Sequence, residues 1–288
     1  MPYIVKDAHS VMGTFVTITV VHPHPDEARK AICAAFDEIY RINDLMSVHK
    51  ETSEVSLLNK TGCYKGVSAA TKYVIERANH FSQLSNGAFD ITILPILKLW
   101  GKSARTGKLP TDAEINEASE LVNYRNIAIE GNNISFRKAG MSITLAGIAK
   151  GYAVDKAIET LSRGKIRHAL VNAGGDIRAI GGKTEDIPWK IAIRDPKNRK
   201  RSSNTVELRE EAIATSGTYQ RSFNDIINPE AGRPAQGMLS STIIAGKAID
   251  ADILATSMFI LGAERGTELF NRMYGIKSLV ITGNRSLL

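Results

Sequence analysis

The apolar positions along this chain change their spacing several times, and each spacing predicts a particular element. Residues 11–21 are rich in Val, Thr, Phe and Ile, which is typical of a strand. Over residues 26–45 the apolar positions recur every three or four residues and predict an amphipathic helix. The same spacing predicts a second helix at 68–84 and a short helix or turn at 95–100.

Turn and capping residues indicate the elements that follow. Thr111 and Glu114 are the residue types of a capping box, so a helix is expected from there to about Val122. Gly131-Asn-Asn separates the apolar runs 127–130 and 134–136, which predicts a hairpin. The other expected elements are a strand around Ile143, a helix ending at Leu161, a strand at 168–172, antiparallel strands over 189–214, a strand at 240–244, helices at 250–261 and 263–273, and a strand at 278–282. This mixture indicates the α+β fold class.

Length and composition are those of an ordinary globular protein. The chain has 288 residues, of which 43% are hydrophobic, so a large core is possible. No Pro/Gly/Ser-rich linker divides it, and residues 1–288 are expected to form one unit or two closely joined α/β subdomains. No apolar run reaches the roughly 20 residues that a membrane span needs. The N-terminus lacks the features of a secretion signal, so we expect a cytoplasmic protein as written, or an extracytoplasmic or membrane-anchored one if a leader has been removed.

The net charge of +7 favours an anionic partner. Much of the excess lies in residues 197–201, directly after Asp195-Pro196, where a solvated hairpin loop is expected. Nucleic-acid binding requires aromatic residues among the basic ones, and this segment has none. Nucleic acid is therefore not an expected partner.

The stretch Ile143-Thr-Leu-Ala-Gly-Ile-Ala-Lys-Gly-Tyr-Ala-Val-Asp155 gives the first chemical signal. A strand is expected to run into a small-residue turn and then into a helix that carries Lys150. Such a junction offers backbone N–H groups and the positive end of a helix to an anion. Its glycines match neither a Walker A loop nor the dinucleotide-binding fingerprint. A strand packed on a helix with an exposed lysine explains this stretch equally well.

Two residues of a later predicted helix are candidates for holding a cation. Asp252 and Thr256 are four residues apart, so the carboxylate and the hydroxyl project from one face of the helix. With one backbone carbonyl they would suffice for Mg²⁺, which takes its other ligands from water and phosphate. The same spacing is common on ordinary helix surfaces. On such a surface, replacing Asp252 would cost little stability.

Two glycine-rich turns are candidates for the same pocket. Asn172-Ala-Gly-Gly-Asp176 follows a predicted buried strand, and its glycines allow a ligand to approach the backbone closely. Ala214-Thr-Ser-Gly-Thr218 places hydroxyls after another strand, where they would bond phosphate or cap local backbone. An ordinary tight turn accounts for either motif.

The order of these motifs resembles that of the ApbE family of FAD:protein FMN transferases over nearly the whole chain. The matching motifs are Met12-Gly-Thr, Ser53-Glu-Val-Ser-Leu-Leu-Asn59, Gly87-Ala-Phe-Asp-Ile-Thr92 with Trp100-Gly, Gly147-Ile-Ala-Lys-Gly-Tyr-Ala-Val-Asp155, Asn172-Ala-Gly-Gly-Asp176, Ala214-Thr-Ser-Gly217, Ile227-Asn-Pro229 with Gly232-Arg-Pro234, and Ala251-Asp-Ile-Leu-Ala-Thr256. The resemblance implies a T-fold-like architecture with mixed or antiparallel sheets, packed helices and FAD bound in a cleft between the subdomains.

The resemblance also implies a reaction. Enzymes of this family use Mg²⁺ to transfer the FMN moiety of FAD to a Thr or Ser hydroxyl of an acceptor protein, and AMP is released. The alternatives are an FAD pyrophosphatase that gives FMN and AMP, and a noncatalytic flavin-binding carrier. The sequence does not identify the acceptor protein.

Site residues follow from the matching positions. The implied metal ligands are Asp252, Thr256 and a backbone carbonyl at Ala146 or Gly147, of which Ala146 is favoured. The implied catalytic residues are Asp225, Lys150 and Asp252. The implied FAD contacts are Met12, Gly87, Ala88, Phe89, Asp90, Lys150, Asp155, Asp176, Thr215, Ser216 and Gly217.

One motif departs from the family pattern. Relatives usually carry Ser-His-Ile-Ile-Asp-Pro where this chain has Asn224-Asp-Ile-Ile-Asn-Pro229, so Asp225 takes the place of the histidine. An aspartate with an ordinary pKa is a weaker base than histidine at neutral pH, although burial would raise its pKa. Thr144 and Thr218 also occupy positions where aspartate is common. Slower transfer, FAD hydrolysis and a turn-capping Asp225 all agree with this sequence.

Overall fold

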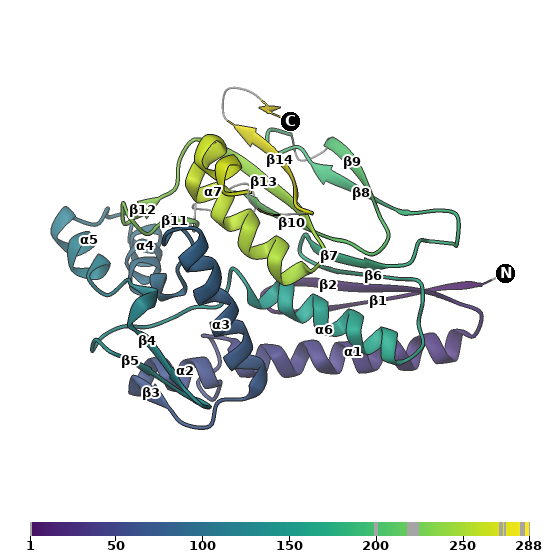
Figure 1. Ribbon diagram of the computed structural model, residues 1–288, viewed down its shortest axis with the longest axis horizontal. Helices are drawn as coiled ribbons and strands as arrows, with labels where there is room; N and C mark the ends of the chain where they lie inside the picture. Colours follow the sequence, from purple (N-terminus) through teal and green to yellow (C-terminus); the bar gives the residue numbers. More distant parts are fainter. Residues whose placement is uncertain are drawn as a thin grey trace.

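An eight-stranded sheet forms the centre of the molecule, with the strand order β1-β2-β6-β7-β10-β13-β14-β15 (Figure 1). The computed structural model describes residues 2–198, 201–217, 225–270, 273, 275–282 and 286–287. The strands of this sheet are β1 (Tyr3–Val11), β2 (Thr14–His22), β6 (Ala169–Ala173), β7 (Asp176–Ile180), β10 (Ala212–Gly217), β13 (Met238–Ala245), β14 (Lys277–Thr282) and β15 (Ser286–Leu287). Every neighbouring pair in this sheet is antiparallel.

Three helices cover one face of the sheet (Figure 1). They are α1 (Pro25–Met46), α6 (Ala149–Arg163) and α7 (Ala248–Phe270). The buried side chains of α1 recur every three or four residues, as its sequence predicted, and join inward-facing residues of β2 such as Ile18 in the main core. At Gly262 the backbone of α7 leaves the helical conformation, which confirms the predicted break between two helical segments.

A two-stranded ribbon of β8 (Trp189–Arg194) and β9 (Ser202–Leu208) packs on the other face of the sheet. Trp189 and Ile213 belong to this second apolar cluster, whereas Ala214 belongs to the main core. Successive side chains of a strand point to opposite faces, so β10 contributes to both clusters. Thr215 and Ser216, the next two residues of β10, therefore point to opposite faces of the sheet.

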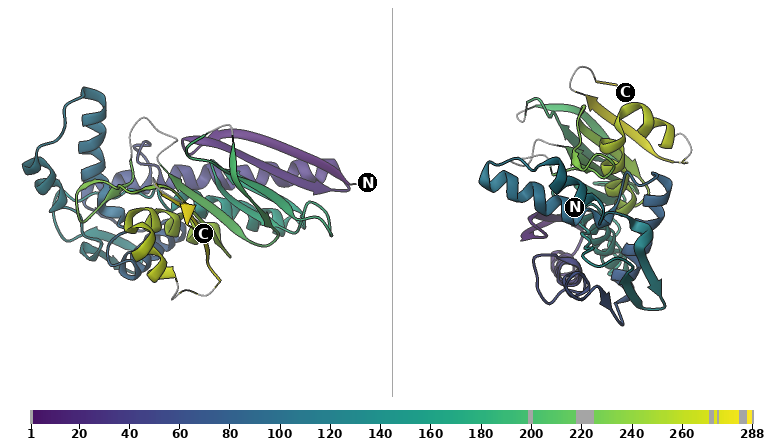
Figure 2. Two further views of the ribbon diagram at one scale, coloured as in Figure 1. Left: turned by 90° about the horizontal axis from the view of Figure 1, so that it is seen from above. Right: turned by 90° about the vertical axis from the view of Figure 1, so that its left-hand side faces the viewer.

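The remaining elements gather at the end of the molecule opposite the N-terminus (Figures 1 and 2). They are α2 (Glu54–Thr61), β3 (Cys63–Tyr64), α3 (Ala69–Leu84), η1 (Ile91–Ile93), α4 (Leu94–Thr106), α5 (Asp112–Ser119), η2 (Tyr124–Asn126), β4 (Ile127–Glu130), β5 (Asn133–Phe136), β11 (Ile227–Asn228) and β12 (Arg233–Pro234). The predicted capping box is present, with bonds in both directions between Thr111 and Glu114. The Trp100 ring N–H donates to the Gly232 carbonyl at 2.9 Å, so two of the family-type motifs meet at this end.

The α+β class is confirmed, and several local expectations differ from the structure. Among the longer elements, strands β1 and β7 and helix α2 were not predicted. The strand expected around Ile143 is wrong, because residues 141–145 join no sheet. The Asn59 side chain instead bonds both backbone groups of Ile143, accepting from its N–H at 2.7 Å and donating to its carbonyl at 2.8 Å. Within the described part of the chain, no helix is long and apolar enough to cross a membrane.

Candidate active site

The first turn of α6 brings two acidic residues from other elements together. Lys150 on this turn forms an ion pair with Asp176, the first residue of β7, and its Nζ lies 3.8 Å from Oδ1 of Asp252 on α7. The backbone N–H of Gly151 donates to Asp252 Oδ2 at 3.1 Å. The N–H groups of a first helical turn have no partner within the helix, so this bond also satisfies the backbone. Lys150, Asp176 and Asp252 were all predicted site residues, and the structure places them in one cluster.

Gly151 permits the close approach of α6 to α7. A Cβ at this position would overlap the carbonyl oxygen of Ala248 and lie 2.7 Å from its carbonyl carbon. Backbone therefore meets backbone where the two helices cross. Any larger residue at position 151 would separate Asp252 from the first turn of α6.

Asp252 is buried, with 4% of its surface exposed, so the expectation of a surface carboxylate is wrong. Burial and the nearby negative charge of Asp176 raise its pKa to about 7, against the opposing effects of Lys150 and the Gly151 N–H. Asp176 is buried as well. Two buried acids share one lysine here, and an additional cation would stabilise both.

Thr256 lies one helical turn beyond Asp252 and meets two other predicted segments. Its hydroxyl is 3.1 Å from the Ser216 hydroxyl of β10. A Cβ at Gly147 would lie 3.6 Å from this Thr256 hydroxyl and 3.2 Å from the Phe89 ring. The Ala146–Gly147 turn, the Phe89 loop and Thr256 therefore adjoin one another. Of the two turn residues, Ala146 is exposed and Gly147 is partly buried.

These residues fit a hard divalent cation such as Mg²⁺. Within the described residues, the buried Asp252 carboxylate accepts from the Gly151 N–H and lies near Lys150, and Thr256 and the Ala146–Gly147 turn add uncharged oxygen atoms nearby. Oxygen ligands with one or two carboxylates are the set that Mg²⁺ takes in proteins. Among the described residues, no group of three or more His, Cys, Asp or Glu side chains has the arrangement of a metal site. The candidate set therefore depends on Asp252.

The turn that contains Met12 adjoins the glycine-rich turn before Asp176. Met12 joins β1 to β2 with a positive φ of 55° and packs partly against the main core. A Cβ at Gly174 would overlap the hydroxyl of Thr14, so these two turns touch. Met12 therefore lies in a turn that touches the turn before Asp176, and its contact with FAD stays a prediction.

The Gly87–Asp90 loop is held by its own acid. Gly87 has a positive φ of 83°, and Phe89 is buried. Asp90 accepts from the Thr92 N–H at 2.8 Å and, through its other oxygen, from the Tyr124 N–H at 2.9 Å. Burial raises the pKa of Asp90, against these hydrogen bonds. Asp90 fixes the loop, and direct contacts of this loop with FAD stay predictions.

The Thr215 side chain is not brought to this cluster. Its hydroxyl pairs with that of Thr242 at 2.9 Å across β10 and β13, on the sheet face opposite Ser216. Only the backbone of Thr215 can therefore face the same side as Ser216. Gly217 ends β10, while Thr218 and Asn224 lie outside the described residues.

Asp225 lies partly buried in the irregular segment before β11, and its catalytic role stays a prediction. Asn228, at the position of the family aspartate, accepts from the Glu230 N–H at 2.9 Å and from the Ala231 N–H at 3.3 Å. It therefore caps the β11–β12 turn.

Three residues with clear roles near the site were not predicted. Gly151 and Asn59 lie within motifs that the sequence analysis identified. The motifs mark these two residues but do not show which groups they contact. Arg178 pairs with Asp155 at 2.7 Å from an ordinary strand position that no motif marks.

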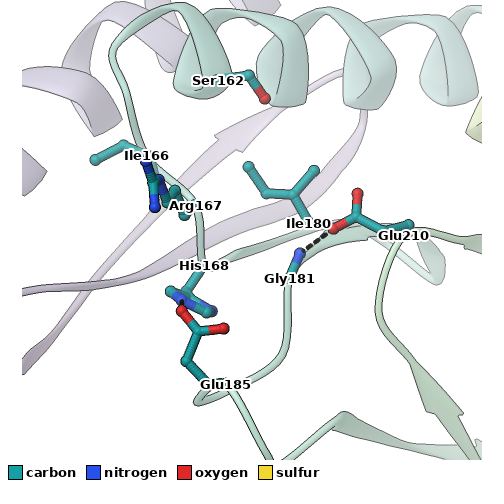
Figure 3. A pocket seen from close by; sticks show the side chains of 8 residues that line it. All are labelled: Ser162, Ile166, Arg167, His168, Ile180, Gly181, Glu185 and Glu210. Carbon is teal, nitrogen blue, oxygen red and sulfur yellow. Dashed lines mark hydrogen bonds and ion pairs between the residues drawn. The ribbon is translucent and has the colours of Figure 1, made fainter.

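Two hollows in the described part of the structure do not include this cluster. One, of about 400 Å³, is shown in Figure 3, where Glu185 points toward His168 and Glu210 bonds the Gly181 N–H at 2.7 Å. The other, of about 580 Å³, lies among α1, α3, α6 and the start of α7. Neither is lined by Lys150, Asp176 or Asp252.

The fold and site together define a class of protein in which a helix-covered antiparallel sheet presents a buried acid, hydroxyls and a lysine at glycine-rich turns. The ApbE family model matches residues 12–280, and the chain belongs to the ApbE family. An FAD:protein FMN transferase of Vibrio cholerae is 33% identical over 269 residues, covering 88% of this chain and 80% of that protein.

Solved structures give the same relationship. The flavin transferase ApbE from Vibrio cholerae matches with a TM-score of 0.89 and 31% identity, covering 98% of this chain and 94% of that one. The ApbE protein from Thermotoga maritima matches with a TM-score of 0.87 and 31% identity, covering 99% and 95%. The ApbE-type architecture expected from the sequence is therefore confirmed.

Proposed function

We propose that this protein is a Mg²⁺-dependent FAD:protein FMN transferase, which moves the FMN moiety of FAD to a Thr or Ser hydroxyl of an acceptor protein and releases AMP. The observation that carries the proposal is the cluster of Lys150, Asp176 and Asp252 beside the Ser216–Thr256 pair. Membership of the ApbE family and the name shared by its relatives support it. In this proposal residues 1–288 act as one catalytic unit.

Cleavage of a pyrophosphate requires that negative charge on the phosphate oxygens be neutralised and that the nucleophile be held in line. Mg²⁺, when bound by Asp252, Thr256 and the Ala146 carbonyl, would supply charge neutralisation and orientation. Lys150 and the N-terminal end of α6 add positive potential at the same place. The nearby Ser216 hydroxyl orients Thr256.

The reaction forms one P–O bond and breaks another. The acceptor hydroxyl gives its proton to a base, its oxygen attacks the phosphorus on the FMN side, and the bond to AMP breaks. Asp225 is the candidate base, because it occupies the position of the family histidine. Since aspartate is ordinarily a weak base, hydrolysis of FAD to FMN and AMP by water is the second candidate function.

The test is incubation with FAD, Mg²⁺ and an acceptor protein that carries a flavinylation site, followed by denaturing electrophoresis. A fluorescent flavin band on the acceptor is expected, and it should be absent with Asp252→Asn. Chromatography without acceptor separates the other possibilities. FMN and AMP formed rapidly would favour the pyrophosphatase, and FAD that stays intact in both assays would favour a carrier.

A further inference from the structure

Asp155 lies on α6 beyond the first turn and is almost fully buried, with 3% of its surface exposed. Its Oδ1 accepts from the Ala248 N–H at 2.9 Å, and its Oδ2 accepts from the Ile249 N–H at 3.0 Å. These two N–H groups belong to the first turn of α7, where no partner exists within the helix. A side chain of α6 therefore caps the start of α7.

The capping between α6 and α7 is reciprocal. Asp155 of α6 accepts from the first turn of α7, and Asp252 of α7 accepts from the Gly151 N–H in the first turn of α6. The two helices meet backbone to backbone at Gly151 and Ala248. Each helix thus supplies the carboxylate that satisfies the other, and the position of Asp252 depends on both contacts.

Strand β7 anchors both ends of this arrangement. Asp176 and Arg178 are two residues apart on β7, so their side chains lie on the same face of the sheet. Asp176 pairs with Lys150, and Arg178 pairs with Asp155 at 2.7 Å. The strand therefore holds α6 at two points, with the acid on the strand in one pair and on the helix in the other.

Arg178 also favours the ionised form of the buried Asp155 carboxylate. Burial raises the pKa of Asp155, and the Arg178 charge is the largest opposing effect, followed by the Ile249 and Ala248 N–H groups. A buried carboxylate without such partners would take up a proton and accept less strongly from the helix.

We propose that Asp155 and Arg178 are positioning residues for the catalytic cluster. They fix the first turn of α7 against α6 and β7, which sets where Asp252 and Thr256 present their oxygens. Asp252 lies four residues after Ala248, one turn along the same helix face, so a shift of the capped turn is transmitted to it directly. The proposal rests on the function proposed above and extends it to residues that need not touch FAD.

The chain offers a matched control for the test. Asp250, also in the first turn of α7, pairs with Arg77 of α3 at 2.8 Å. This contact joins two partly exposed side chains and does not involve the α7 backbone. Asp250→Asn removes an ion pair from the same turn without removing the cap. It should leave metal binding within about twofold of the unaltered protein, because exposed pairs contribute little.

The variants that test the proposal are Asp155→Asn and the double change Asp155→Asn with Arg178→Met. Mn²⁺ binding followed by electron paramagnetic resonance, FAD affinity, flavin transfer, thermal unfolding and hydrogen exchange of α7 would be measured in each. Both should weaken Mn²⁺ binding by about 10- to 100-fold and speed exchange of the Ala248 and Ile249 amides, as expected when the partner of a ligand-bearing element is lost. The double variant leaves no unpaired guanidinium, so it should recover thermal stability relative to Asp155→Asn while metal binding stays weak.

Weak metal binding in a variant of recovered stability separates positioning from a merely structural role. If the double variant binds Mn²⁺ and exchanges its α7 amides like the unaltered protein, the positioning role is overturned. If the unaltered protein binds Mn²⁺ and FAD but labels no acceptor, the proposed transferase function fails instead. The metal and exchange measurements decide the positioning role in that case too.

Discussion

Asp155 and Asp252 are buried carboxylates on neighbouring helices, and they differ in how completely they are bonded. Asp155 accepts two backbone N–H groups and pairs with Arg178 at 2.7 Å. Asp252 accepts one backbone N–H, and the Lys150 ammonium lies 3.8 Å away. That lysine is also paired with Asp176, which adds a second negative charge beside Asp252.

The difference agrees with a structural role for Asp155 and with the cation-binding role proposed for Asp252. A charge taken out of water is costly unless partners replace the lost solvation. At Asp155, Arg178 and two N–H groups offset part of this cost, although burial still raises its pKa. At Asp252 the partners are incomplete, and its pKa rises to about 7 because of burial and Asp176. In the function proposed above, a divalent cation would be the further partner of Asp252, whereas Asp155 already lies against the Arg178 guanidinium.

Asp252→Asn should give the largest effect and the clearest contrast with Asp155. Transfer is expected to fall by roughly 1000-fold, the size of loss seen when one preorganised electrostatic contact is removed. The metal-free protein should unfold at the same or a higher temperature, because a buried charge beside Asp176 has been removed. Flavin transfer and thermal unfolding without Mg²⁺ measure the two effects. A large fall in the unfolding temperature would show that Asp252 is as structural as Asp155.

Gly151→Ala should disturb both acids together. The added methyl group overlaps the Ala248 carbonyl, so α6 and α7 must separate, which costs about 1–3 kcal/mol of unfolding free energy as in other overpacked contacts. Asp155 and Asp252 would both lose their helix-to-helix bonds. Urea unfolding and Mn²⁺ binding check this, with Gly246→Ala as a control because a Cβ there meets nothing within 4 Å. Equal stability of the two variants would mean that the helices adapt without strain.

The contrast between the two acids was only partly readable from the sequence. Local periodicity predicted α1, α3, α6 and the later strands, because each buries a face whose spacing is fixed by its own geometry. Strand β1 was missed because most of its side chains are exposed, and an edge strand without a buried face shows no apolar alternation. The strand predicted around Ile143 was wrong because the backbone of Ile143 bonds the side chain of Asn59, 84 residues away in the chain, rather than a neighbouring strand.

The site was predictable as a set of residues, although their roles were not. Motif order indicated that Lys150, Asp176 and Asp252 lie near one another, and the structure places them in one cluster. The Asp-x-x-x-Thr spacing says which side chains share a helix face, but not what packs over that face, so the burial of Asp252 was missed. The pairing of Asp155 with Arg178 joins a helix to a strand and leaves no local pattern.

The apparent affinity for Mg²⁺ should depend on pH, because protonation of the Asp252 carboxyl competes with metal binding. Below about pH 7 its carboxyl is protonated in the metal-free protein, so apparent Mg²⁺ affinity should fall about tenfold for each unit lost. In the unfolded chain the pKa is about 3.9, so between these values the folded state binds more protons and stability without metal falls as pH rises. Saturating Mg²⁺ should remove much of that fall. Thermal unfolding from about pH 5 to about pH 8 measures this.

Asp252→Asn is the control for the pH series. It removes the contribution of Asp252 to the change of stability with pH and leaves the contribution of Asp155, because burial also raises the pKa of Asp155. The same slope in both proteins would mean that Asp252 does not titrate in this range.

Ser216→Ala should produce the smallest effect, confined to the Asp252 side of α7. The Ser216 hydroxyl lies 3.1 Å from that of Thr256, and a neutral hydrogen bond of this kind contributes about 1 kcal/mol, or about fivefold in metal affinity. Thr215→Ala is the matched control, since that hydroxyl pairs with Thr242 on the other face of the sheet. Mn²⁺ binding should weaken in the first variant alone, and the amides capped by Asp155 should exchange normally in both. Equal weakening by the two changes would mean that the hydroxyls act through the sheet rather than on Thr256. The distinction between the turn capped by Asp155 and the Asp252–Thr256 segment would then lose its basis.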